Sequence, residues 1–315
     1  MNIVITDAQT VTNGDISLDI LNELGEVTVY NLTDKSELVS RIKNADAVIC
    51  NKTLLNEEVL SKAKKLKYIG LFATGYNNID IDYCKSRGIT VCNAGSYSTN
   101  SVAQQTFAFI LEHYNKVAKY NTFVQNGGWL SSPTFSPFVF PLNELRGKTI
   151  GIVGYGSIGK AVERIANAFN MNILISSRTE QKTVYGRFVS FDELLQNSDI
   201  VTVHCPLNKD SKYMFNKLTF NKMKDGAFFI NTARGGVLVE EDLVNALENG
   251  KLSGAGIDVL EYEPMTANCK LMAAKNCLIT PHIAWAPYET RIRLINIVHG
   301  NLKAFIEGNP TNVVC

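Results

Sequence analysis

Short apolar runs alternate with amphipathic segments along the whole chain of 315 residues. A short apolar run between turn residues indicates a buried strand, and apolar residues with the period of a helical turn indicate a helix. Such alternation predicts an α/β fold with parallel sheets that are covered on both faces. The predicted strands fall in two series, at 2–6, 27–30, 47–50, 68–71 and 90–92, and then at 148–153, 172–176, 200–204, 227–231, 254–258 and 277–280.

Two successive series of strands predict two domains. Helices are predicted between the strands of the first series, at 16–24, 36–43, 57–63 and 80–87. Residues 101–120 are predicted to form one long apolar helix with no strand directly after it, and we expect this helix to carry the chain between domains. A last helix at 292–306 is expected to return to the first domain. We therefore predict a first domain of residues 1–99 plus 288–315 and a second domain of residues 100–287.

The composition is typical of a soluble globular protein. Hydrophobic residues make up 45% of the chain, charged residues make up 19%, and the net charge is +1. This balance gives no reason to expect a nucleic acid or a membrane as a partner. Residues 1–7 lack the basic and long apolar regions of a signal peptide. The seven cysteines are scattered without a C-x-x-C pair, so we expect reduced thiols in a cytoplasmic protein and no metal site.

A glycine-rich loop, Gly154-Tyr155-Gly156-Ser157-Ile158-Gly159, lies between the strand at 148–153 and a helix predicted at 160–169. In this context the first glycine allows a tight turn, the second lets the backbone approach a pyrophosphate, and the third lets helix and strand pack closely. The helix N-terminus also favours phosphate groups through its free N–H groups and its dipole. The loop therefore predicts a dinucleotide-binding site.

Three polar side chains come after three successive strands of the second series: Arg234, Glu263 and His282. Taken singly, each is more often structural, as a salt-bridge partner, a solvated loop residue or a histidine of the core. Ligands of open parallel sheets bind at the carboxyl ends of strands, and these residues follow a nucleotide loop. Together they supply what the reduction of a keto acid needs, namely a carboxylate clamp, a proton donor and a group that tunes the donor. We therefore predict an oxidoreductase site at these strand ends.

Other candidate residues carry less weight. His113 and His299 lie in predicted helices and are expected to be structural, whereas His204, at a strand end near the glycine-rich loop, stays ambiguous. Tyr213 and Lys217 have the Tyr-x-x-x-Lys spacing seen in short-chain dehydrogenases, which these two residues resemble. That family has its glycine-rich loop near the N-terminus and its tyrosine far downstream, so we interpret this pair as a chance match.

The chain resembles the D-isomer-specific 2-hydroxyacid dehydrogenases over nearly its whole length, and most of all the glycerate dehydrogenase and hydroxypyruvate reductase branch. Besides the glycine-rich loop, the resemblance rests on His204-Cys205-Pro206-Leu207, Asn231-Thr232-Ala233-Arg234-Gly235-Gly236, Asp258 with Glu263-Pro264, and Pro281-His282-Ile283-Ala284-Trp285. It implies that Arg234 binds the substrate carboxylate, that Glu263 pairs with His282, and that His282 is the acid/base of the reaction.

The resemblance implies further contacts with the substrate and the cofactor. Backbone N–H groups of Ala73, Thr74 and Gly75 would help Arg234 and His282 to hold the substrate. The cofactor would contact Gly154, Gly156, Ser157, Ile158, Gly159, Ser177, Arg178, Thr179, His204, Cys205, Pro206, Ser211, Thr232, Ala233, Asp258 and Ala284.

The resemblance also implies a flavodoxin-like substrate domain for 1–99 plus 288–315 and a Rossmann-like dinucleotide-binding domain for 100–287, with the active site in the cleft between them. A small 2-keto acid such as hydroxypyruvate or glyoxylate would be reduced to the D-2-hydroxy acid, with His282 as proton donor. A homodimer would use the region after the helix at 101–120. The alternative is a nucleotide-sensing corepressor of the same fold, which can keep the three site residues; the lack of extended disordered tails argues against it.

The sequence departs from the family pattern at three places. Gln104 stands where members often have a glutamate, and Asn170 stands where a glycine usually precedes the second strand of the cofactor domain. An NAD-specific site wants an acidic residue after that second strand, to accept hydrogen bonds from the ribose hydroxyls. This chain has Ser177, Arg178 and Thr179 there. We therefore expect NADP(H) to be the preferred cofactor, with NAD(H) still possible.

Overall fold

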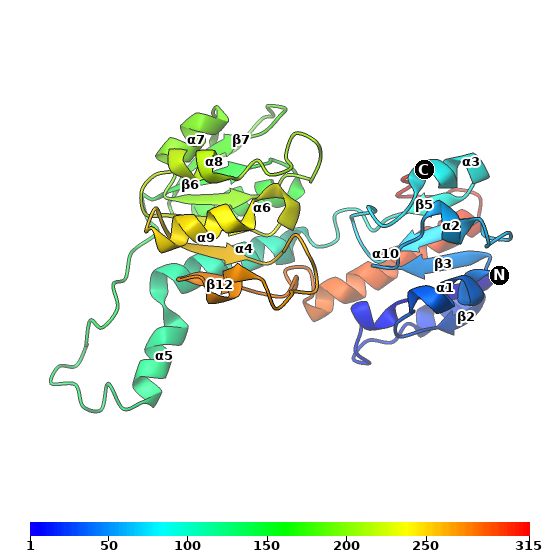
Figure 1. Ribbon diagram of the computed structural model, residues 1–315, viewed down its shortest axis with the longest axis horizontal. Coiled ribbons are helices and arrows are strands. Elements are labelled where there is room, and N and C mark those ends of the chain that lie inside the picture. The colour runs from blue at the N-terminus through cyan, green and yellow to red at the C-terminus, as the bar shows by residue number, and fades with distance from the viewer. The chain divides into compact units, whose positions relative to one another are not determined.

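The chain divides into two units, each built on one parallel sheet. The computed structural model describes all 315 residues, and the units comprise Met1–Ser98 with Ala286–Cys315 and Thr99–Trp285 (Figure 1). The sequence places these boundaries after residues 99 and 287, whereas the structure places them after Ser98 and Trp285. The two parallel sheets confirm the predicted α/β class.

The first unit has a five-stranded sheet in the order β2-β1-β3-β4-β5, which is the flavodoxin-like order. Its strands are β1 (Asn2–Ile5), β2 (Glu26–Val29), β3 (Ala47–Cys50), β4 (Tyr68–Leu71) and β5 (Thr90–Cys92). Its helices are α1 (Lys35–Ile42), α2 (Glu57–Leu60), α3 (Ile81–Arg87) and α10 (Tyr288–Ile306), with short 3₁₀ helices η1 (Ala8–Thr10) and η2 (Asp19–Leu24). Every residue of β3 and β4 is buried, because these strands are apolar without interruption and lie in the middle of the sheet.

The predicted helix at 16–24 is a 3₁₀ helix over Asp19–Leu24, so that prediction is wrong in type. Only Leu21 of this segment is buried, which leaves no broad apolar face to support an α-helix. Gly25 then leads at once into β2, and a Cβ at this position would lie 2.2 Å from the carbonyl oxygen of Met1. The close approach of the two strands therefore ends the helix early.

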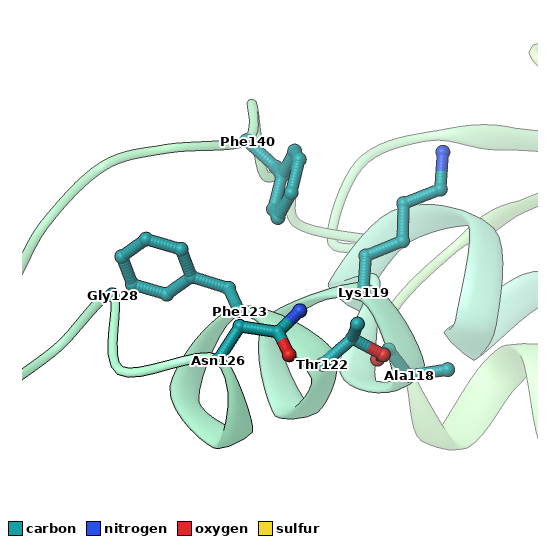
Figure 2. Close-up of a pocket in the computed structure, with 7 residues that line it drawn as sticks. All are labelled: Ala118, Lys119, Thr122, Phe123, Asn126, Gly128 and Phe140. Atoms are coloured by element: carbon teal, nitrogen blue, oxygen red, sulfur yellow. The ribbon is translucent and has the colours of Figure 1, made fainter.

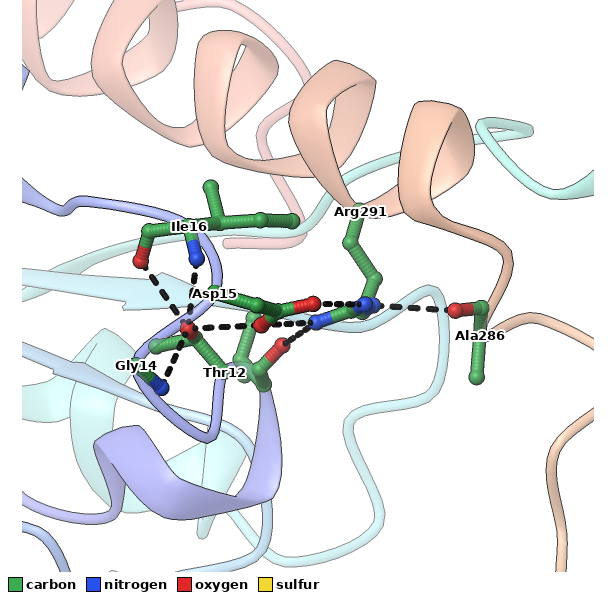
Figure 3. A network of polar contacts seen from close by, with 7 residues as sticks. Thr12, Gly14, Asp15, Ile16, Ala286 and Arg291 are labelled. Carbon is green, nitrogen blue, oxygen red and sulfur yellow. Dashed lines mark hydrogen bonds and ion pairs between the residues drawn. The ribbon is translucent and has the colours of Figure 1, made fainter.

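The last helix is fastened to the N-terminal part of the first unit by Arg291. Its guanidinium donates to both carboxylate oxygens of Asp15, at 2.9 and 2.6 Å, and to the carbonyl oxygens of Val11 and Ala286, at 3.2 and 2.9 Å (Figure 3). The hydrogen bond from Arg291 is the main cause that lowers the pKa of Asp15 below its usual range. This polar network joins segments that lie at opposite ends of the sequence.

The second unit has a seven-stranded sheet in the order β12-β11-β10-β9-β6-β7-β8. Its strands are β6 (Thr149–Val153), β7 (Asn172–Ser176), β8 (Arg187–Phe188), β9 (Ile200–Val203), β10 (Ala227–Asn231), β11 (Leu252–Ile257) and β12 (Cys277–Ile279). Its helices are α4 (Thr99–Asn115), α5 (Val117–Gln125), α6 (Ser157–Ala168), α7 (Phe191–Asn197), α8 (Lys217–Lys222) and α9 (Glu240–Glu248), with 3₁₀ helices η3 (Gly235–Val237) and η4 (Lys270–Ala273). The chain order reverses between β6 and β9, which is where ligands bind in such sheets.

Two apolar clusters cover the two faces of this sheet. Phe228 and Ile230 point into the cluster that α4 and α6 complete, while Phe229 between them points into the cluster that α7, α8 and α9 complete. This alternation is the expected result of the pleat, in which successive side chains of a strand face opposite sides. The buried strand residues thus fix the register that brings the polar strand ends to one edge of the sheet.

The predicted single helix at 101–120 is two helices. α4 ends at Asn115, Lys116 takes a left-handed conformation with φ of 51°, and α5 begins at Val117. The Lys116 ammonium donates to the carbonyl oxygen of His113, which satisfies one of the free carbonyls at the end of α4. α5 buries none of its residues, and Figure 1 shows it projecting with the following loop from the second unit. We call residues 117–142 the arm.

Candidate active site

The glycine-rich loop has the geometry that a dinucleotide requires. Gly154 has a φ of 94°, and a Cβ there would lie 2.6 Å from the backbone nitrogen of Cys205. A Cβ on Gly159 would lie 2.4 Å from the carbonyl oxygen of Gly154. A Cβ on Gly156, in contrast, would meet no atom within 4 Å. The first and third glycines therefore serve close packing, whereas the second leaves open space at the N-terminus of α6, where a pyrophosphate would fit.

The end of β7 carries the residues expected near the adenosine ribose. Ser177 is half-buried, and its hydroxyl donates to the carbonyl oxygen of Thr179 at 2.6 Å. Arg178 and Thr179 are exposed. Ser177 thus shapes the turn after β7. The exposed guanidinium of Arg178 is accessible to a ligand that binds at this strand end.

The next strand along the sheet from β6 is β9, and it leads into His204. The backbone N–H of His204 donates to Val153 at 2.7 Å, and its ring Nε2 lies 2.9 Å from the hydroxyl of Thr202. Its Nδ1 is buried without a partner. Burial lowers the pKa of His204 to about 3, so the ring is neutral near pH 7 and cannot act as the proton donor there.

The loop after His204 is closed by Ser211. Its hydroxyl donates to the carbonyl oxygen of Pro206 at 2.7 Å and accepts from the N–H of Asn208 at 2.8 Å. Ser211 is buried, whereas Pro206 is exposed and Cys205 is half-buried. Of the cofactor contacts predicted in this loop, Cys205 and Pro206 are accessible to a ligand. Ser211 is buried and stabilises the turn that contains them.

Arg234 follows β10 in a turn that Asn231 fixes. The Asn231 amide donates to the carbonyl oxygen of Arg234 at 2.9 Å and accepts from the N–H of Ala233 at 3.0 Å. The Arg234 guanidinium donates to the carbonyl oxygen of Ala233 at 2.7 Å and is half-buried. A Cβ on Gly235 would lie 2.1 Å from the carbonyl oxygen of Leu260. The turn of Arg234 and the acidic loop after β11 are therefore in direct contact.

The side chains of His282 and Glu263, which are expected to pair, lie within hydrogen-bonding distance of each other. Nδ1 of His282 lies 2.7 Å from Oε2 of Glu263, and the two side chains are 26% and 31% exposed. The other carboxylate oxygen of Glu263 accepts from the N–H of Leu260 at 3.0 Å. His282 has a φ of 55°, which is uncommon for a residue other than glycine.

Asp258 holds the loop that carries His282. The N–H of His282 donates to the carbonyl oxygen of Asp258 at 2.8 Å. Its buried carboxylate accepts from the Thr280 hydroxyl at 2.6 Å and from the N–H groups of Ile283 and Ala284 at 2.9 and 3.0 Å. Burial raises the pKa of Asp258 although these hydrogen bonds oppose it. The sequence predicts Asp258 and Ala284 as cofactor contacts but gives no sign that the two residues bind each other.

The two remaining histidines and the Tyr213 pair have structural surroundings. His113 stacks on Phe228 with ring centroids 4.1 Å apart, and burial lowers its pKa to about 4. His299 belongs to the first unit and lies 3.4 Å from Glu23. The Tyr213 hydroxyl donates to Glu261, and this hydrogen bond raises the pKa of the phenol. A catalytic tyrosine needs the opposite shift, which agrees with a chance match.

The predicted substrate segment of the first unit follows β4. The carbonyl oxygen of Ala73 accepts from Ala94 at 2.9 Å, and that of Thr74 accepts from the Asn93 amide at 2.8 Å. The Thr74 hydroxyl donates to the carbonyl oxygen of Gly95. These bonds use carbonyl and hydroxyl groups and leave the backbone N–H groups of Ala73, Thr74 and Gly75 without acceptors inside the unit. The segment is thus held in a form that presents donors.

A glycine-rich nucleotide loop and a histidine paired with a glutamate are the features expected of a nicotinamide-dependent dehydrogenase. Residues 107–284 match the family model of the D-isomer specific 2-hydroxyacid dehydrogenase, NAD binding domain. The chain therefore belongs to the D-isomer-specific 2-hydroxyacid dehydrogenase family, which confirms the resemblance.

Individual relatives agree with this membership. The chain is 43% identical over 320 residues to a hydroxypyruvate reductase of Blautia hydrogenotrophica, with 100% of this chain and 99% of the relative covered. Its fold is similar to that of an acyclic imino acid reductase in complex with NADPH and D-Arg, with a TM-score of 0.89, 29% identity and 100% of both chains covered. It is also similar to a D-lactate dehydrogenase from Aquifex aeolicus complexed with NAD and lactic acid, with a TM-score of 0.85, 31% identity, and 98% and 96% of the two chains covered.

Proposed function

We propose that this D-2-hydroxyacid dehydrogenase reduces a small 2-keto acid, such as hydroxypyruvate or glyoxylate, to the D-2-hydroxy acid. The observation that carries the proposal is the 2.7 Å contact between His282 and Glu263 on a loop beside the turn of Arg234. The similarity to a hydroxypyruvate reductase supports the choice of substrate.

The residues divide the reaction among them. Arg234 binds the substrate carboxylate with its planar fork of donors and so places the keto carbon. When bound, the nicotinamide supplies the hydride to that carbon. Glu263 holds Nδ1 of His282, which leaves Nε2 as the nitrogen that gives a proton to the carbonyl oxygen of the substrate. Backbone N–H groups of Ala73, Thr74 and Gly75 add donors for the substrate carboxylate.

The test is turnover with hydroxypyruvate, glyoxylate and pyruvate, followed by chiral chromatography of the product. We expect kcat/KM to be highest with one of the first two and the product of hydroxypyruvate to be D-glycerate. Cofactor binding without turnover of any 2-keto acid would refute the proposal and favour a regulatory protein of the same fold. An L-product would refute the assigned geometry of Arg234 and His282.

We further propose that NADP(H) is preferred over NAD(H), which can still bind. A carboxylate after β7 would repel a 2′-phosphate, whereas here the strand leads into Ser177, Arg178 and Thr179. Arg178 is exposed and can pair with the phosphate, while Ser177 removes the repulsion. Charge-assisted hydrogen bonds contribute about 1.5–3 kcal/mol each, so loss of one changes affinity by about tenfold or more.

The measurement is the ratio of kcat/KM for NADPH to that for NADH with the same keto acid. In Ser177→Asp/Arg178→Ala the ratio should fall by about tenfold to a hundredfold, because repulsion is added and a bond is lost. The variant Lys222→Met, which breaks an exposed ion pair with Asp192, is a matched control for loss of a surface cation and should leave the ratio unchanged. A wild type that prefers NADH would refute the preference, as would a double variant with the ratio of the wild type.

We also propose a homodimer that forms through the arm. Leu130, Phe135 and Phe138 are 93%, 91% and 91% exposed, although isolated proteins seldom expose so many large apolar side chains together. The loop is nevertheless ordered, because the Tyr120 hydroxyl donates to the carbonyl oxygen of Phe140 at 2.9 Å and accepts from its N–H at 3.1 Å. A hollow of 530 Å³ beside it is lined by Ala118, Lys119, Thr122, Phe123, Asn126, Gly128 and Phe140 (Figure 2). Apolar side chains of a second copy would pack into this hollow.

Light scattering after size exclusion would measure the dimer. Phe135→Ser/Phe138→Ser should raise the dissociation constant at least about tenfold, since two aromatic side chains lose their burial. A wild type that remains monomeric at high concentration would refute the dimer.

The location we propose is the cytoplasm, on the ground that all seven cysteines are free thiols. No helix of the structure is long and apolar enough to span a membrane.

A further inference from the structure

Glu163 is a charged residue at a position where a helix normally packs apolar atoms. It lies on α6 between Val162 and the next buried residue Ala166, and it is 2% exposed. A buried carboxylate is stable only when hydrogen bonds replace its water. The identity of its partners therefore shows which part of the molecule depends on this charge.

Four donors surround the carboxylate of Glu163. One oxygen accepts from the hydroxyl of Tyr155, inside the glycine-rich loop, at 2.5 Å. The other accepts from the Thr183 hydroxyl and from the N–H groups of Tyr185 and Gly186, both at 2.9 Å. Burial raises the pKa of Glu163, but the hydrogen bonds from Thr183, Tyr155 and the two N–H groups outweigh it, and the net shift is downward. The group is therefore held as a carboxylate.

The hydrogen bonds of Glu163 hold residues 183–186, which form the C-terminal end of the loop after β7. Thr183 also accepts from the N–H of Gly186 at 3.1 Å, so the segment 183–186 folds around one anchor. One turn earlier on α6, the Lys160 ammonium donates to the Gln181 amide oxygen at 2.8 Å. The helix of the glycine-rich loop thus holds residues 181–186, the end of the loop that begins with Ser177, Arg178 and Thr179.

We infer that Glu163 is a positioning residue that fixes the loop of residues 177–186 and thereby sets affinity for the ribose end of the cofactor, most strongly for a 2′-phosphate. The inference rests on the proposed cofactor preference. A loop that is ordered before the ligand arrives loses less conformational entropy on binding. NADPH would use more of this loop than NADH, because only NADPH offers the phosphate to Arg178.

The test uses Glu163→Gln, which keeps the size of the side chain but removes its charge and one acceptor oxygen. We expect the KM for NADPH to rise about fivefold to twentyfold and the KM for NADH to rise at most about twofold, whereas kcat at saturating NADPH and the KM of the keto acid stay within about twofold. Thr183→Val should act in the same direction, which keeps the inference testable if Glu163→Gln does not fold.

The matched control is Asp199→Asn. Asp199 also accepts a backbone N–H, that of Thr149 at 2.8 Å, and binds Lys224 at 2.7 Å, but it lies at the amino end of β9. Its loss should lower the melting temperature without changing the ratio of the two KM values. The inference is overturned if Glu163→Gln and Thr183→Val keep the wild-type ratio, or if Asp199→Asn changes it as much.

The proposed cofactor preference and the proposed role of Glu163 can be refuted independently of each other. A wild type that favours NADH refutes the preference alone. In that case Glu163→Gln must still raise the KM of NADH about fivefold while Asp199→Asn does not, because the loop would then hold the free ribose hydroxyls. An unchanged KM for NADH in that background overturns the role of Glu163 as well.

Discussion

The pairing of His282 with Glu263 leads to a quantitative prediction. Glu263→Gln keeps an oxygen for the N–H of Leu260 but replaces the charge that faces Nδ1 of His282 at 2.7 Å. A charge-assisted hydrogen bond contributes about 1.5–3 kcal/mol. Because the side chains are 26% and 31% exposed, solvent screening limits the loss to about 1.5–2 kcal/mol. If all of it falls on the transition state, kcat drops by about 10- to 30-fold.

The assay is steady-state reduction of hydroxypyruvate at saturating NADPH. His282→Ala should lose about 10²–10⁴-fold in kcat, as expected when a positioned proton donor is removed. In Glu263→Gln/His282→Ala, the second change should cost less than about threefold more, since Glu263 acts through the imidazole. His299→Gln is the matched control, because His299 also lies near a glutamate but outside the site. Penalties that multiply in the double variant, or a wild-type rate in Glu263→Gln, would refute the coupling of Glu263 to His282.

Three further predictions concern the clamp, the glycine-rich loop and stability. Arg234→Lys keeps the charge but loses the fork, so KM for the keto acid should rise and kcat should fall; wild-type kcat/KM would contradict the clamp. Gly156→Ala should raise the dissociation constant of the cofactor at least about tenfold with little change in melting temperature, whereas Gly159→Ala, whose Cβ would lie 2.4 Å from a carbonyl oxygen, should lower the melting temperature. Asp15→Asn should lower the melting temperature at pH 7. The difference should shrink as the pH falls below 3.8 and should be gone only below the lowered pKa of Asp15 in the folded state, since that is where the folded protein also binds the proton. A difference that persists at low pH would show that the ion pair with Arg291 is not its cause.

The strands were the part of the fold that apolar pattern could predict. The runs at 47–50 and 68–71 match β3 and β4 because a central parallel strand is apolar on both faces. The break at Lys116 could not be predicted, since the apolar period continues through it and a lysine rarely adopts the left-handed conformation that separates α4 from α5. The short strand β8 was not predicted either, because two residues are too few to show the alternation of apolar and polar positions that indicates a strand.

The candidate site shows the same division between residue type and geometry. Spacing after strands singled out Arg234, Glu263 and His282, because parallel strands bring their carboxyl ends to one edge. The left-handed φ of His282 and the anchoring role of Asp258 depend on contacts between residues far apart in sequence. Glu163 gave no signal at all, since a glutamate within an amphipathic helix predicts a solvated position.

Three buried carboxylates in this chain do the same physical work. Asp7, which follows β1, accepts from the N–H groups of Lys52 and Thr53 after β3, at 2.7 and 2.9 Å. Asp258 accepts from the loop of His282, and Glu163 from the loop after β7. Loops that bind a ligand must keep their side chains exposed, so apolar burial cannot hold them in place. A carboxylate placed under the loop accepts its N–H groups instead, and a partner lost from such a buried group costs about 1–3 kcal/mol. The loops after β7 and β12 are therefore held by a carboxylate beneath them. Glu163 acts through its loop, so its substitution should change affinity for the cofactor although its side chain need not touch the ligand.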